Sequence, residues 1–439
     1  MERLEKFIVV FFIFLMVPIS LTLYFSLEKN QQIALQNKSM FSASLSDSTL
    51  PILPDNKVID QAVVIENDLS KKLQNPPEII KAVYLTSYSA NSKKYFDNYL
   101  LDIFKKTEIN SVVIDIKDYT GYVSYLSQAP EVIKYKTSKN IITDLSSLIK
   151  KLHEKNIYVI ARISIFEDPA LAKARPDLAV FDKSLPLVLE KKERLWKDNN
   201  GLHWLDPYSK EVQDYNIAIA KDALANGFDE INFDYIRFPS DGKMENARFP
   251  FWDGKTSRHL VIREFFKEIR QNLPDAKLSV DLFGQATISY DDLGIGQIIE
   301  DSFEYFDYVC PMVYPSHYAK TFMGFENPAL YPYDVVKGSM ESAMLRENNY
   351  FKLKEISVSD SNSEKINQNN IIKIKAKIRP WLQDFNMGAV YTTDMVKEQI
   401  TATKEALGGN YVGYMMWNPS NVYKTEAFTN ENKNDIINK

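Results

Sequence analysis

The sequence contains very little cysteine and histidine. Its 439 residues include one cysteine, Cys310, and four histidines. A single cysteine excludes an intramolecular disulfide and a cysteine-based metal site. Four histidines leave little material for a histidine-rich metal site. We therefore expect neither a bound metal nor another cofactor.

An excess of basic charge is also missing. The chain has 53 Lys and Arg against 58 Asp and Glu, which gives a net charge of −5 and a pI of about 5.7. Without a broad positive field, nucleic acid is not expected as a partner. The 45% of hydrophobic and 13% of aromatic residues are enough for a sizeable core, in one large domain or two of ordinary size.

One long hydrophobic run stands at the N-terminus. Residues 7–25, "FIVVFFIFLMVPISLTLYF", contain no charge and follow Arg3 and Lys6. The run nearly matches the roughly 20 residues of a membrane-spanning helix, and the preceding charges predict an extracytoplasmic body. A cleaved signal peptide is the alternative, but "YFSLEKN" offers no small-residue cleavage site. We expect residues 1–27 to be an uncleaved signal anchor that binds the protein to the membrane.

Composition divides the rest of the chain into three parts. Residues 28–77 are rich in Ser, Asn and Gln and end at Pro76-Pro77, so we predict a flexible linker. Residues 78–425 are predicted to form the folded domain. Residues 426–439 read as a polar tail.

In the folded domain, strand-like runs alternate with amphipathic, helix-like runs. Such alternation predicts parallel βαβ units, and eight of them predict a (β/α)8 TIM barrel with insertions. A doubly wound sheet is the alternative, but a Gly-rich loop would be expected after its first strand, where this chain has "TSYSANSKK". The strand-like runs are 81–88, 111–117, 157–165, 229–237, 277–284, 307–314, 378–385 and 411–418, and the helix-like runs are 94–106, 143–155, 210–226, 256–273, 334–347 and 394–407.

Two insertions interrupt this alternation. Residues 167–209 separate the third strand from its helix and carry Trp196 and Trp204, which we expect either to pack the loop or to line a sugar site. Residues 348–375 are Asn/Ser-rich and are predicted to form a peripheral polar excursion. The fifth unit is the weakest, because its helix around 295–303 is short.

The fourth strand carries polar residues in an apolar run, "EINFDYIRFPSDG". Because side chains alternate along a strand, Asn232 and Asp234 lie on one face of the strand and Phe233 lies on the other. Active sites of such barrels lie at the C-terminal ends of the strands. We therefore expect Asp234 at the barrel mouth, with Arg237 at the rim, where it pairs with Asp234 or with a substrate oxygen.

The other strands end in polar residues too. The second strand puts Asp115 and Lys117 on one face, as a predicted buried salt bridge or substrate-orienting pair. The fifth strand puts Asp281 on the lumen side. The remaining predicted substrate-binding residues, all at or just after strand ends, are Tyr314, His317, Asp384, Trp417 and Asn418.

Carboxylates beside aromatic residues favour cleavage of glycosidic bonds. Retaining glycosidases place two carboxyls about 5–5.5 Å apart and inverting ones leave a wider gap. The two carboxyls need different environments to hold different pKa values. Asp234 beside Arg237 would stay ionised, as a nucleophile requires. Asp281, between Val280 and Leu282, would be the less solvated acid.

Six blocks of the sequence resemble a family of bacterial surface and secreted proteins with a glycoside hydrolase-like domain of unknown function. The blocks are "VVIDIKDYTGYVSY", "FDYIRFPSDG", "VDLFGQ", "DYVCPMVYPSHY", "RPWLQDF" and "GYMMWNPSN", within residues 81–423. The family is similar to α-amylase-like and α-galactosidase-like barrels. The resemblance implies a TIM barrel and a retaining carbohydrate-active enzyme.

The resemblance also implies catalytic roles. The nucleophile of related barrels ends the fourth strand, which is the place of Asp234. The acid/base follows the fifth strand in amylase-like barrels, which points to Asp281. In galactosidase-like barrels it follows the sixth strand, where this chain has only Tyr314 and His317. Asp384, Asp168 and Asp115 are therefore kept as alternative acids.

Three functions compete on the sequence alone. The first is a membrane-anchored, extracytoplasmic glycoside hydrolase that acts on a polysaccharide. The second is a non-catalytic glycan-binding barrel, which needs no pair of carboxyls in reach of one bond. The third, a metal-dependent hydrolase, needs three ligands around an open position. Only His203 and His317 are candidates for its histidine ligands, so this function is disfavoured.

Overall fold

The computed structural model describes residues 71–360 and 375–429. The predicted anchor at residues 7–25 and most of the predicted linker lie outside the described residues. Among the helices of the described ranges, none is both long and apolar enough to span a bilayer.

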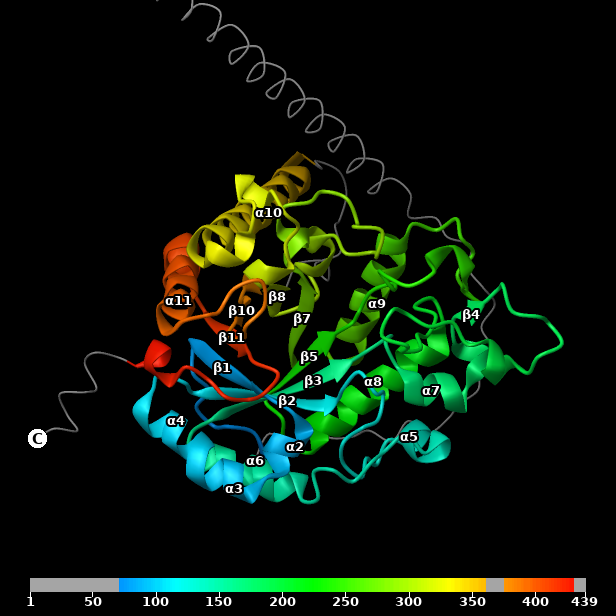
Figure 1. Cartoon of the computed structure of the whole chain (residues 1–439), viewed down its shortest axis with the longest axis horizontal. Helices are drawn as coiled ribbons and strands as arrows, with labels where there is room; N and C mark the ends of the chain where they lie inside the picture. Colours follow the sequence, from blue (N-terminus) through cyan, green and yellow to red (C-terminus); the bar gives the residue numbers. More distant parts are fainter. Residues whose placement is uncertain (1–70, 361–374, 430–439) are drawn as a thin grey trace, which may run out of the picture. The chain divides into compact units, whose positions relative to one another are not determined.

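Parallel strands close into a barrel, which confirms the predicted TIM barrel (Figure 1). Around the barrel the order is β10, β11, β1, β2, β3, β5, β7 and β8, and the pairing of Trp381 with Met312 joins β10 back to β8. The barrel strands are β1 (Ile80–Leu85), β2 (Ser111–Lys117), β3 (Tyr158–Ser164), β5 (Glu230–Asp234), β7 (Lys277–Phe283), β8 (Tyr308–Met312), β9 (Lys377–Ile378), β10 (Trp381–Gln383) and β11 (Gly413–Trp417).

The seventh barrel position is split in two. The predicted continuous strand 378–385 is instead β9 and β10, with Arg379 and Pro380 between them. Proline has no N–H to donate and interrupts a strand ladder. Pro380 therefore separates β9 from β10. β10 ends at Gln383, and Asp384 lies just beyond it.

Helices follow most of the strands on the outside of the barrel (Figure 1). Residues 295–303 form no α-helix, only a 3₁₀ turn at Ile299–Ser302, as the weak fifth unit predicted. The helices are α2 (Ser87–Asn91), α3 (Lys93–Tyr95), α4 (Leu101–Lys106), α5 (Pro130–Tyr135), α6 (Leu145–His153), α7 (Pro169–Ala174), α8 (Lys210–Ala225), α9 (Arg258–Asn272), α10 (Pro332–Asp360) and α11 (Thr393–Leu407), and a π-helical turn at Phe96–Leu100 joins α3 to α4.

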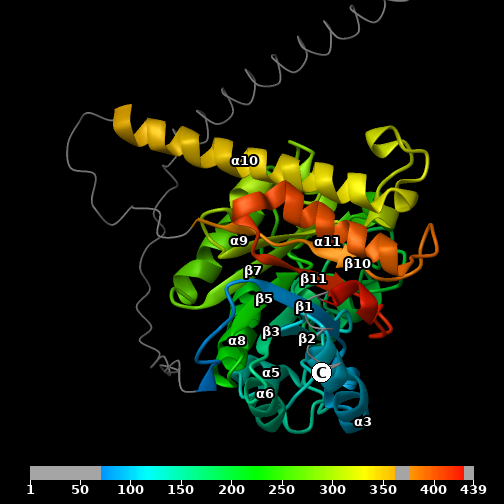
Figure 2. The same cartoon turned by 90° about the vertical axis from the view of Figure 1, so that its left-hand side faces the viewer.

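The longest helix corrects one prediction. α10 lies beside α11 and runs on to Asp360 (Figure 2), so the predicted polar excursion begins as helix. Tyr350 and Phe351 explain the extension, because both are buried against Phe303, with ring centroids 5.7 and 6.2 Å away. The rest of the excursion, residues 361–374, lies outside the described residues.

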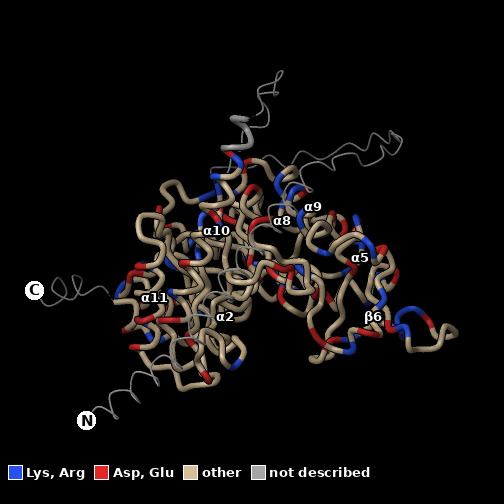
Figure 3. The backbone as a smooth tube through the Cα atoms, turned by 90° about the horizontal axis from the view of Figure 1, so that it is seen from above, with Lys and Arg blue, Asp and Glu red and all other residues tan. Residues whose placement is uncertain are grey.

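The insertion after β3 forms a small platform next to the barrel. It holds α7 and β4 (Phe181–Asp182), and β4 pairs antiparallel with β6 (Ala247–Arg248) from the loop after β5. Trp196 and Trp204 are 1% and 2% exposed, so both pack inside this insertion. In Figure 3 acidic and basic residues alternate over the described residues rather than forming one basic face.

The N-terminal end of the barrel lumen is closed by a buried ion pair. Glu230, the first residue of β5, binds Arg379, and both side chains are 0% exposed. Glu230 also accepts hydrogen bonds from the hydroxyls of Ser279, at 2.5 Å, and Tyr158, at 3.3 Å. Leu73 packs against the neighbouring core, so the end of the predicted linker contacts the bottom of the barrel.

Candidate active site

One guanidinium joins two carboxylates at the C-terminal end of the lumen. Arg162 on β3 donates from Nε to Asp234 Oδ2 at 3.1 Å, and its Nη1 binds Asp115 Oδ1. All three side chains are at most 6% exposed. A hydrogen-bonded cation offsets the cost of burying a carboxylate. Arg162 was not among the predicted site residues, yet it lies at the centre of this cluster.

Two aromatic residues hold Arg162 in place. The ring of Trp417 lies 5.1 Å from the guanidinium and stacks on Tyr84, with 3.9 Å between the ring centroids. The Tyr84 hydroxyl donates to Asp115 Oδ2. A guanidinium packed on an aromatic face is attracted by the ring and restricted in orientation. The Trp417 ring therefore restricts the orientation of the Arg162 guanidinium, and the Tyr84 hydroxyl restricts the orientation of the Asp115 carboxylate that Arg162 binds.

The residue after Asp234 has a strained backbone. Tyr235 has a φ of 50°, in the left-handed region that non-glycine residues rarely adopt. In this conformation its N–H donates to Asp234 Oδ1 at 2.6 Å. Strained residues of this kind cluster at functional sites. The strain supports Asp234 as a functional residue.

Asp281 on β7 is a second carboxyl in the barrel lumen. It is 0% exposed, Asn232 donates to its Oδ1 at 2.8 Å, and the side chain of Trp381 also interacts with its carboxyl. Burial, and next the negative charge of Asp234, raise the pKa of Asp281 well above its usual range. The cluster therefore contains a carboxyl that can act as an acid beside a carboxylate held by Arg162.

Glu167, three residues after β3, is another carboxyl at this end of the barrel. It is 3% exposed, and its Oε2 lacks a partner in the described part of the chain. Burial raises the pKa of Glu167 to about 8, and the charges of Asp198 and Asp234 act in the same direction. Asp198, which accepts from Trp204 Nε1 at 3.0 Å, also interacts with the Glu167 carboxyl, and this interaction raises the pKa of Glu167 further. No sequence pattern indicated Glu167, because it lies in a loop where strand alternation does not apply.

Tyr314 and His317 lie near the carboxyls but at different depths. Tyr314 is 7% exposed, and burial together with the charges of Asp281 and Asp234 raises the pKa of its hydroxyl well above the usual value. The His317 ring lies farther out, with its centroid 5.3 Å from that of Tyr314 and its Nδ1 3.0 Å from Ser316 Oγ. Tyr314 is thus a hydroxyl that stays protonated beside the carboxyls.

The predicted pairing of Asp115 with Lys117 is wrong. The β2–β3 register shifts between these residues, so an extra residue interrupts the alternation of the strand. Such a bulge turns the following side chain to the other face. Lys117 therefore leaves the lumen and binds Asp168 Oδ2 at 2.8 Å and Asn216 Oδ1 at 3.0 Å. Asp115 binds Arg162 instead.

Arg237 does not pair with Asp234 either. β5 ends at Asp234, and the left-handed turn at Tyr235 leads the chain away from the lumen. Arg237 donates from Nη1 to the oxygens of Phe238, at 3.0 Å, and Ser240, at 3.2 Å. Its guanidinium lies 4.7 Å from the rings of both Trp204 and Phe283. It is placed on the wall of the mouth rather than in the carboxylate cluster.

Asp384 and Asn418 hold the loop that follows β11. Asp384 is 0% exposed and accepts from the Lys424 N–H at 2.9 Å as well as pairing with its ammonium. Asn418 donates to Val422 O at 2.6 Å and accepts from Ser420 N at 3.0 Å. Their polar atoms are engaged in the loop. The structure thus brings together Asp115, Asp234, Asp281, Tyr314 and Trp417 and places the other predicted residues around them.

Comparison with models of protein families identifies the family of this chain. Residues 82–423 match the model of a family described as "Putative glycosyl hydrolase domain". The chain belongs to this family. Glycosyl hydrolases of barrel type act at the C-terminal strand ends, which is where the family member described here gathers its buried carboxyls around Arg162.

Solved structures with a similar arrangement include three from different bacteria. A hypothetical protein from Ruminiclostridium thermocellum ATCC 27405 is 37% identical, with a TM-score of 0.41, over 48% of this chain and 98% of its own. The glycoside hydrolase domain of PgaB (BpsB) from Bordetella bronchiseptica is 13% identical, with a TM-score of 0.47, over 81% and 99%. The α-galactosidase TtGalA from Thermus thermophilus is 12% identical, with a TM-score of 0.44, over 83% and 62%. A search of curated proteins gives no match.

Proposed function

We propose that this member of the family is a glycoside hydrolase that cleaves a polysaccharide by retaining double displacement. Asp234 attacks the anomeric carbon, and a protonated carboxyl gives its proton to the departing glycosidic oxygen. The same carboxyl then takes a proton from the water that releases the sugar from Asp234. The observation that carries the proposal is the lumen cluster, in which Arg162 holds Asp234 while Asp281 keeps a proton.

The strand register supports the retaining variant. Phe233 pairs with Val280, so the next residues on the two strands are Asp234 and Asp281. Neighbouring strands lie about 4.8 Å apart. Carboxyls carried side by side on neighbouring strands fit the 5–5.5 Å separation of retaining enzymes better than the wider gap of inverting ones.

For the acid/base we propose Asp281, with Glu167 as the second candidate. Asp281 lies beside Asp234 in the register and is the more deeply buried of the two. Glu167 has the pKa of about 8 that would keep it protonated at neutral pH. Both carboxyls can hold the proton, and a comparison of their variants on poor and good leaving groups separates them.

We also propose that the enzyme works outside the cytoplasm, tethered by residues 7–25. The support is the charge-free run behind Arg3 and Lys6. Membrane fractions washed with alkaline carbonate should retain the full-length chain, and protease added outside intact cells or spheroplasts should digest the domain. Release by carbonate, or protection from the protease, would remove the anchor from the proposal.

Hydrolysis of a glycan panel that includes cell-wall polysaccharides tests the function. The full-length wild type should release reducing ends from at least one glycan, and Asp234→Asn should lose about three or more orders of magnitude in kcat/KM while staying folded. Asp241→Asn, an exposed residue of the loop after β5, is the matched control and should keep full activity. Equal rates for wild type and Asp234→Asn would refute the nucleophile. Glycan binding without cleavage would instead favour the non-catalytic barrel.

A further inference from the structure

A cavity of about 320 Å³ opens between the loops that follow β5 and β7. This volume lies at the lower end of the roughly 300–1,000 Å³ typical of ligand pockets. Both loops leave the C-terminal ends of neighbouring barrel strands, so the cavity lies on the active-site side of the barrel. Its lining consists of Pro239, Ser240, Met244, Ala247, Phe249, Trp252, Arg258, Leu293, Gly294 and Ile295.

The aromatic wall of the cavity is built on buried supports. Asp206, which is 0% exposed, accepts from the N–H groups of Phe251, at 2.6 Å, and Trp252, at 3.0 Å. The Phe249 and Trp252 rings stand nearly at right angles, 5.5 Å apart, and Trp252 Nε1 donates to a backbone carbonyl at 2.8 Å. The polar edge of this indole is thus satisfied inside the protein, which leaves apolar ring surface for a ligand. The two rings form an apolar corner, and apolar ring surface suits the C–H face of a sugar.

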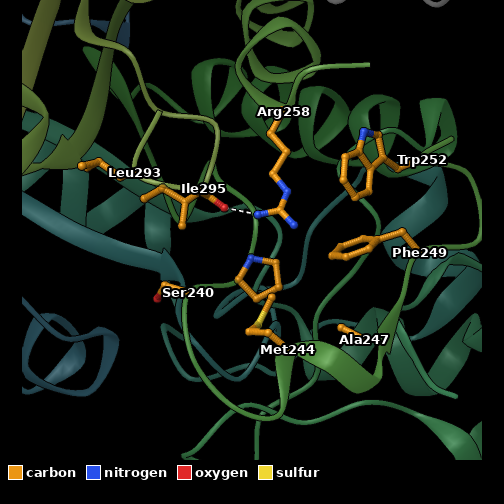
Figure 4. Close-up of a pocket in the computed structure, with 10 residues that line it drawn as sticks. Ser240, Met244, Ala247, Phe249, Trp252, Arg258, Leu293 and Ile295 are labelled. Carbon is orange, nitrogen blue, oxygen red and sulfur yellow. Dashed lines mark hydrogen bonds between the residues drawn. The ribbon is translucent and has the colours of Figure 1, made fainter. Parts of the chain in front are cut away.

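Arg258 supplies the one charged side chain of the lining. Figure 4 shows its guanidinium between Trp252 and Phe249 on one side and Ile295 on the other. The guanidinium lies 5.0 Å from the Trp252 ring, and Nη1 binds the carbonyl of Gly294. Within residues 71–360 and 375–429, Arg258 pairs with no carboxylate, although most of the buried and half-buried arginines there do. A guanidinium that is oriented by its neighbours and lacks an acidic partner is suited to bind a carboxylate from a ligand.

The cavity is connected to the catalytic cluster through two residues. Ser240 lines the cavity and accepts from Arg237 Nη1 at 3.2 Å. Arg237 in turn interacts electrostatically with Glu167 and Asp234 at the mouth. Phe238, beside Arg237, donates its N–H to Ile295 O at 2.8 Å and ties the two walls together. The cavity and the catalytic cluster therefore share a wall, which Arg237 and Ser240 form.

We propose that the cavity is a subsite for a sugar residue that bears a carboxylate, with its ring on Trp252 and Phe249 and its carboxylate on Arg258. The identity of this sugar as part of the substrate rests on the proposed glycosidase function, whereas its binding does not. An acidic polysaccharide is then the substrate class that the subsite selects.

Binding of a matched pair of sugars tests the subsite without any turnover. Saturation-transfer NMR and titration of the full-length protein should detect glucuronate and should detect glucose about tenfold more weakly or not at all. Arg258→Gln should reduce glucuronate affinity by about tenfold or more. Arg248→Gln is the matched control, because Arg248 is exposed on β6 and does not line the cavity. Equal binding of the two sugars, no binding of either, or full glucuronate binding by Arg258→Gln would overturn the proposal.

Turnover separates this proposal from the glycosidase itself. Arg258→Gln should lower kcat/KM for acidic glycans about tenfold, mainly through KM, and leave neutral glycans unchanged. Hydrolysis with no effect of Arg258→Gln on any glycan would refute the subsite and keep the glycosidase. Glucuronate binding without hydrolysis of any glycan would keep the subsite and refute the glycosidase.

Discussion

The two ends of the barrel lumen both bury charge, but they balance it differently. At the N-terminal end one acid, Glu230, meets one base, Arg379, and two hydroxyls complete the shell of the carboxylate. At the C-terminal end one base, Arg162, faces Asp115, Asp234 and Asp281. The first end is matched in charge, and the second has more carboxyls than its guanidinium can neutralise.

This difference separates a structural ion pair from a candidate active site. A matched pair of buried charges, with its remaining oxygens hydrogen-bonded, leaves no net charge to neutralise, so it can serve as a purely structural closure of the barrel. An excess of buried carboxyls favours the protonated form of some of them, and the pKa values of Asp281 and Glu167 are both raised, chiefly by burial. Burying acids without partners costs stability, and such a cost is typical of sites that must perform proton transfer.

The largest expected effect comes from removing a proton donor at the C-terminal end. Asp281→Asn should lower kcat/KM for an unactivated glycoside about 10²- to 10⁴-fold. An aryl glycoside with a good leaving group needs little protonation and should be cleaved at a rate much closer to the wild type. Glu167→Gln, measured in parallel, should show a smaller loss and no such difference between substrates. The reverse pattern for the two variants would move the acid/base role to Glu167.

Breaking the matched pair at the other end should cost stability rather than activity. Arg379→Met leaves Glu230 buried and unpaired, so the free energy of unfolding should fall by about 3–5 kcal/mol. Urea unfolding measures this loss, and kcat per folded molecule should be unchanged. The double variant Glu230→Gln/Arg379→Met removes the orphaned charge and should recover part of the stability. A loss of kcat in folded Arg379→Met would show that the two ends are not separable.

The raised pKa of Glu167 predicts a pH-dependent stability. Between a pH of about 4.5 and 8 the folded state holds this proton and the unfolded state does not, so stability falls as pH rises through this window. Glu167→Gln removes the effect. Its stability relative to the wild type should therefore increase from pH 4.5 to pH 8 by on the order of 3 kcal/mol. Urea unfolding at both pH values checks this, and a constant difference between the two proteins would contradict the assigned shift.

The smallest effect is expected from a matched pair of tyrosines. Tyr84 donates to Asp115 at the C-terminal end, and Tyr158 donates to Glu230 at the N-terminal end. Each Tyr→Phe change should cost about 1–2 kcal/mol of stability, because a buried carboxylate loses one donor. Tyr84→Phe alone should also lower kcat several-fold, since Tyr84 helps to orient Arg162 through Asp115. Equal kcat values for the two variants would argue against this positioning role.

The barrel was predictable because its pattern is repeated. Each of the eight strand positions shows an apolar run, so an error in the predicted bounds of one strand does not change the predicted order of strands in the barrel. The departures have local causes, such as Pro380, which splits the seventh strand. Another is the packing of Tyr350 and Phe351 on Phe303, which extends α10 into a polar segment.

The candidate site was predictable only as far as strand alternation holds. It located Asp115, Asp234 and Asp281 in the lumen, and the same rule would have found Arg162, an arginine within the apolar run "IYVIARISI". Strand alternation placed Lys117 on the wrong face, because no sequence pattern marks the one-residue bulge between Asp115 and Lys117. Glu167 depends on a loop path and on burial by distant residues, which no local pattern contains.

Tyr235 also bears on how this sequence can change. Glycine and asparagine enter its left-handed conformation more easily than tyrosine does, while its ring packs near Trp204 and Arg237 at the mouth. A library selected for heat tolerance alone should drift toward the small residues at this position, and one selected for turnover should keep the aromatic ring. Selection for stability and selection for activity would therefore favour different residues at position 235.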